Sequence, residues 1–167
     1  MPHNQSRSRS ERSPIADKVV QTTAEAIRAA RAHDSEEFGA ATDLLALHPE
    51  SREVHALMLR ELLETVFPDG LTGDDVSEVM TSTSRAAASW TPAVSPAAVA
   101  LVLTGALGVG DTADADALPS AGLPDAETTA AALVVIADLT ARVEVDPMEY
   151  VTRAVDEIRR AQTMEMP

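Results

Sequence analysis

The sequence predicts an all-α protein, a compact irregular bundle of about seven helices, and three features lead to this class. Alanine is abundant, and it has the highest helix propensity of all residues. Aromatic residues make up only 2% of the 167 residues, and the β-branched and aromatic runs that build sheets are scarce. Apolar residues recur instead at helical spacing, between signals for helix starts and ends.

Residues 95–108 have the sequence SPAAVALVLTGALG, which contains no charged residue. A helix that is apolar all round is normally buried on all sides. The stretch is shorter than the ~20 apolar residues that span a bilayer. We therefore expect it to form a buried central helix, around which the other helices pack.

Three helices are expected at about residues 14–33, 35–47 and 50–67, and each has a start or stop signal. Pro14 occupies the first helical position, where its missing N–H costs nothing. Asp34 or Ser35 is expected to cap the second helix, and Pro49 separates the second helix from the third.

Four further helices are expected at about residues 72–90, 95–108, 125–140 and 147–160. Side chains that accept hydrogen bonds from a first turn are expected to cap them: Thr72, Ser95, Asp125 and Asp146. No internal repeat of the length typical of solenoids is found, so a single domain is expected over residues 14–167.

The first 13 residues are expected to form a flexible arm rich in Arg and Ser, with three arginines and one glutamate. The whole chain has a formal net charge of −14, so the rest of the protein is strongly acidic. Such a body repels phosphate backbones, and no basic patch outside the arm compensates. We expect no nucleic-acid partner, and we expect the arm to dock on an acidic surface of the protein itself or of a dimer mate.

Composition and the N-terminal sequence exclude further kinds of site and of cellular location. The chain has no cysteine, which excludes disulfides and thiolate metal sites. The N-terminal residues lack the apolar segment of a secretory signal, and no segment is apolar enough to span a membrane. The sequence therefore predicts a cytoplasmic protein without a membrane partner.

His55 is the most informative single residue, because it lies on the apolar face of the helix expected at residues 50–67. The simpler interpretation is a buried histidine that hydrogen-bonds a neighbour. The functional interpretation is a polar group in an apolar pocket. The candidate residues for a pocket or an interface are His55, Met58, Leu59, Leu62, Met80 and Trp90. The apolar members are also explained as ordinary core residues.

No catalytic, cofactor or metal site is predicted. The sequence contains neither an H-E-x-x-H motif nor a nucleophile elbow. The acidic stretch at residues 110–116 departs from the calcium-loop pattern, because Pro119 stands where the turn glycine is required. We interpret it as a solvated loop.

The leading functional hypothesis is a non-enzymatic protein that acts through self-association or a protein partner, with a homodimer as the expected assembly. The alternative is a small-molecule-binding bundle with an apolar pocket between the helices expected at residues 50–67, 72–90 and 95–108. A third hypothesis is an enzyme that uses carboxylates or His55.

Overall fold

The computed structural model describes residues 14–108 and 125–165, and within these residues it contains helices and no strand. The helices in chain order are α1 (Pro14–Ala32), α2 (Ser35–Ala46), α3 (Glu50–Val66), α4 (Gly73–Ala88), α5 (Pro96–Ala106), α6 (Asp125–Arg142) and α7 (Pro147–Met164). The predicted class and number of helices are confirmed. The N-terminal arm, its proposed docking and the acidic stretch at residues 110–116 lie outside the described residues.

Four helices begin at the caps expected from the sequence. Asp34, Ser95 and Asp146 each accept a hydrogen bond from a backbone N–H in the first turn of the helix that follows. Thr72 and Asp75 form a capping box, in which each side chain accepts from the backbone N–H of the other residue. These bonds satisfy N–H groups that have no partner inside the helix.

Two helices end in a left-handed residue that is not glycine. His33 follows α1 with φ 55°, and Glu144 follows α6 with φ 51°. In both turns the next residue donates its N–H back into the helix, from Asp34 to the Ala29 carbonyl at 2.9 Å and from Val145 to the Thr140 carbonyl at 3.2 Å. This ending is usual for helices, but it favours glycine, which adopts positive φ without strain.

The helix at the centre of the bundle is α6, which corrects the expectation for residues 95–108. Residues of α6 pack against all six other helices, and 11 of its 18 residues are buried. In α5 only Ala98, Val99, Leu103 and Ala106 are buried, and Val102 is partly exposed. The physical reason is length: α5 has 11 residues, whereas α6 has 18 and can therefore contact more neighbours along its axis.

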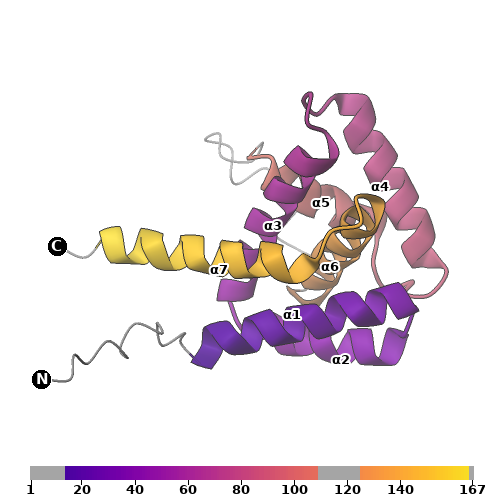
Figure 1. The fold of residues 1–167 in the computed structure, drawn as a ribbon. Coiled ribbons are helices and arrows are strands. Elements are labelled where there is room, and N and C mark those ends of the chain that lie inside the picture. The colour runs from indigo at the N-terminus through magenta and orange to yellow at the C-terminus, as the bar shows by residue number, and fades with distance from the viewer. Residues whose placement is uncertain (1–13, 109–124, 166–167) are drawn as a thin grey trace, which may run out of the picture.

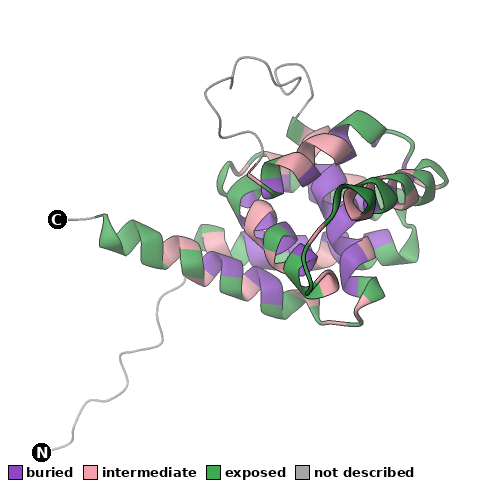
Figure 2. Ribbon diagram, turned by 90° about the horizontal axis from the view of Figure 1, so that it is seen from above, coloured by how far each residue is buried: buried purple, intermediate pink, exposed green. Residues whose placement is uncertain are grey.

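The other helices surround α6 unevenly. The α1 and α2 helices lie side by side along one edge, and α7 crosses the bundle and extends beyond it (Figure 1). Figure 2 shows that the buried residues face the interior, whereas the C-terminal half of α7 is largely exposed. None of the described helices is long and apolar enough to cross a membrane.

Candidate functional site

The six candidate residues separate into four environments. Met58 and Leu62 are fully buried core residues of α3. Met80 is partly buried against the core, and Trp90 lines a small cleft. His55 and Leu59 line a groove between α3, α5 and α6. The structure therefore does not bring the six residues together in one site, and the groove involves α6 rather than α4.

This groove has a volume of about 370 Å³ and is mostly apolar. Its walls are made by Arg52, His55, Ala56 and Leu59 of α3, by Leu101, Val102, Gly105 and Ala106 of α5, and by Asp125, Thr128, Thr129 and Ala132 of α6. Gly105 leaves space in its wall, since a Cβ atom at this position would meet no atom within 4 Å. The volume lies within the range of about 300–1,000 Å³ that is typical of small-molecule sites.

His55 is a deeply buried polar group in this groove, with an exposed fraction of 2%. Its Nε2 lies 2.9 Å from Oγ1 of Thr23, a buried residue of α1. Burial disfavours the charged ring and lowers the pKa of His55 to about 4. The imidazole is therefore neutral near neutral pH. It is better suited to hydrogen bonding than to general base catalysis, for which a pKa near the working pH is best.

Two arginines of α3 bind the helices that form the other walls of the groove. At one end the Arg52 guanidinium donates to the carboxylate of Asp125, the first residue of α6 rather than its cap. Arg60, which is not among the residues that line the groove, donates from Nε to the Ala106 carbonyl of α5 at 3.2 Å. The groove thus has a charged end at the start of α6 and an apolar end near the last turn of α5.

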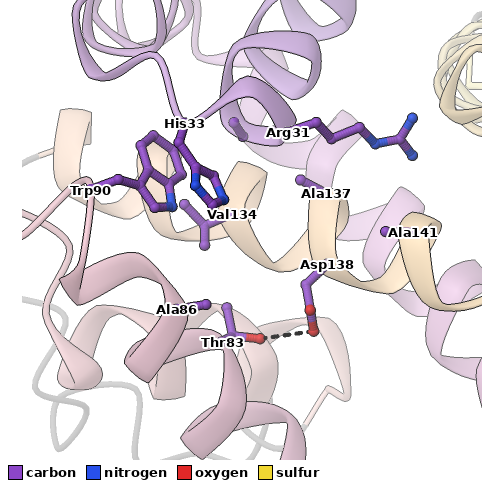
Figure 3. Close-up of a pocket in the computed structure, with 10 residues that line it drawn as sticks. Arg31, His33, Thr83, Ala86, Trp90, Val134, Ala137, Asp138 and Ala141 are labelled. Atoms are coloured by element: carbon purple, nitrogen blue, oxygen red, sulfur yellow. Dashed lines mark hydrogen bonds between the residues drawn. The ribbon is translucent and has the colours of Figure 1, made fainter.

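A second cleft, of about 230 Å³, lies between α1, α4 and α6 and contains Trp90. The rings of His33 and Trp90 are stacked, with centroids 5.5 Å apart (Figure 3). Three polar residues of this cleft form hydrogen bonds with neighbouring side chains: Arg31, Thr83 and Asp138. Asp138 accepts from Thr83 and Arg142. Figure 3 shows the Arg31 guanidinium directed away from the stacked rings, and it donates to Thr140 at 2.8 Å. Packing accounts for these residues, so the α3–α5–α6 groove is the stronger candidate.

In the part of the chain that the structure describes, no group of three or more His, Asp or Glu side chains is placed to hold a metal ion. Comparison with protein-family models, characterised proteins and solved structures finds no match to this chain.

The sequence predicted the α5 helix as one side of the pocket but none of its lining residues, and it did not predict the α6 wall. Leu101 and Gly105 are four residues apart on α5, as are Val102 and Ala106, and Thr128 and Ala132 have the same spacing on α6. A glycine in an otherwise apolar helix is the signal that marks the α5 wall, because it leaves a gap where other residues place a side chain.

Proposed function

We propose that this protein binds a small, mostly apolar molecule in the groove between α3, α5 and α6. The observation that carries the proposal is the combination of an apolar groove of about 370 Å³ with the buried, neutral His55 in its wall. Small-molecule sites typically combine apolar walls with a few placed polar groups that fix the orientation of the ligand. A liquid water molecule occupies about 30 Å³, so the groove has room for a ligand on the order of ten non-hydrogen atoms.

Titration with 1-octanol, followed by amide NMR spectra, tests this proposal. We expect octanol to shift the signals of Leu101, Val102 and Gly105 in a saturable manner. Gly105→Leu fills the groove and should abolish these shifts. Gly39→Leu is the matched control, because Gly39 lies within α2, away from the groove, and its Cβ position is equally open. Saturable binding that survives Gly105→Leu, or the absence of octanol binding to the wild type, overturns the proposal.

A second candidate is self-association through the exposed half of α7, with another copy of this chain as the partner. The buried residues of α7 all lie between Tyr150 and Val155, although the helix continues to Met164, which is 85% exposed. Glu157 and Arg160 are exposed on this half. An antiparallel pair of α7 helices would place Glu157 of each copy near Arg160 of the other, which favours a closed twofold dimer.

Light scattering over a concentration series tests this second candidate. We expect a dimer mass for the wild type, a monomer for Glu157→Arg, and recovery of the dimer when Arg160→Glu is added to that variant. A monomer mass for the wild type at tens of micromolar contradicts the candidate. A dimer mass that persists in Glu157→Arg would show that another surface forms the interface.

A further inference from the structure

We propose that the ligand of the groove carries a carboxylate, which binds Arg52 in place of Asp125. This inference rests on the proposed function and specifies the chemical class of the ligand: a small monocarboxylic acid with an apolar body. Arg52 and Asp125 both line the groove, and their side chains are 67% and 70% exposed. An ion pair so exposed to water adds little stability, so another anion can exchange with Asp125 at low cost.

The order of groups along the groove matches such a molecule. The charged pair lies at one end, and His55 lies three residues further along α3, on the same helix face as Arg52. From the pair the groove continues along α3 to Leu59 and along α6 to Ala132, and both of these side chains are buried. His55 is the intermediate polar group: its side chain is almost fully buried, and its Nε2 lies 2.9 Å from Thr23 Oγ1.

The charged end favours an anion over a cation for two reasons. The guanidinium of Arg52 presents a fork of N–H donors that matches a carboxylate geometrically. Asp125 is the first residue of α6, so a group in its place faces the positive end of the helix dipole, which repels an ammonium. Glu127, also in this first turn, accepts from the Ser95 N–H at 3.2 Å and is thus engaged with the start of α5. The net charge of −14 acts in the opposite direction and attracts cations in general.

Three probes with the same number of carbon atoms test the preference for an anion: octanoate, 1-octanol and octylamine. Their dissociation constants are measured by calorimetry on the full-length protein. A contact with Arg52 that is as exposed as the present ion pair should make octanoate bind up to about fivefold more tightly than octanol. Arg52→Gln should remove this preference without weakening octanol binding. Asp125→Asn should strengthen octanoate binding, because it removes the competing carboxylate.

Arg28→Gln is the matched control, because Arg28 forms a similarly exposed pair with Glu37 away from the groove. It changes the net charge by the same amount as Arg52→Gln and should leave the affinities for octanoate and octanol unchanged. Equal affinities for the three probes, or a preference for octylamine, overturn the carboxylate inference and leave the proposed function standing. Failure of all three probes to bind overturns the proposed function as well.

Discussion

Acidification should destabilise the protein through His55, because the buried ring resists protonation. Its pKa falls from the usual 6.5 to about 4 on burial. Between these two pH values the unfolded chain binds a proton at His55 and the folded chain does not, so the free energy of unfolding decreases as the pH falls. With about 1.4 kcal/mol for each pKa unit, the loss amounts to about 3 kcal/mol and is complete near pH 4.

Urea unfolding between pH 7 and pH 4, followed by circular dichroism, measures this loss. His55→Gln is the reference, because its amide can retain the hydrogen bond to Thr23 but does not titrate. Carboxylates and the other histidines contribute similarly to both proteins, so the difference between the two unfolding free energies isolates His55. This difference should change by about 3 kcal/mol over the interval. Parallel stability curves for the two proteins would refute the assignment of a neutral, buried imidazole.

Three further predictions concern stability and are checked by thermal or urea unfolding. Gly105→Ala and Gly39→Ala should each stabilise the protein by about 0.5–1 kcal/mol, because both glycines lie within helices and both Cβ positions are open; a loss of stability would show that one of these positions is crowded. Glu144→Gly should stabilise by about 1 kcal/mol by relieving the left-handed backbone, and a neutral result would contradict strain at that turn. Leu133→Ala, at a fully buried position of α6, should cost about 2–5 kcal/mol, and more than Leu101→Ala in the partly exposed wall of α5. The reverse order would contradict the central position of α6.

The helix limits were predictable from the sequence because local chemistry determines them. A side chain such as Thr72 or Ser95 satisfies the N–H groups of the adjacent turn, whatever the rest of the fold does. The same holds for Pro96 and Pro147, which fit only the first turn of a helix. These signals are read within a few residues, so the seven helices were expected close to where they lie.

The position of each helix in the bundle depends on long-range packing, which local pattern does not determine. The uniform apolarity of α5 predicted that this helix lies at the centre of the bundle. It is, however, too short to contact every other helix. The charged residues of α6 lie near its two ends. The sequence pattern therefore did not predict that the middle section, from Thr129 to Ala137, is buried throughout.

For the candidate site, the sequence predicted lining residues only on α3, and it predicted α5 as a neighbouring helix without naming its lining residues. Both His55 and Leu59 lie on the apolar face identified from the sequence, and both line the groove. The opposing walls from α5 and α6 belong to segments far apart in the chain. No local rule predicts that Arg52 meets Asp125, a residue 73 positions later.

The stack between His33 and Trp90 also provides the protein with a spectroscopic reporter. Trp90 is the single tryptophan of the chain, and Phe38 packs edge-on to its ring with centroids 5.0 Å apart. Its fluorescence therefore reports whether the end of α4 remains docked on the turn between α1 and α2. Trp90 is not among the residues that line the groove. Two events can therefore be followed separately in the same sample. Undocking of the end of α4 changes the Trp90 emission, whereas ligand binding in the groove is measured by calorimetry.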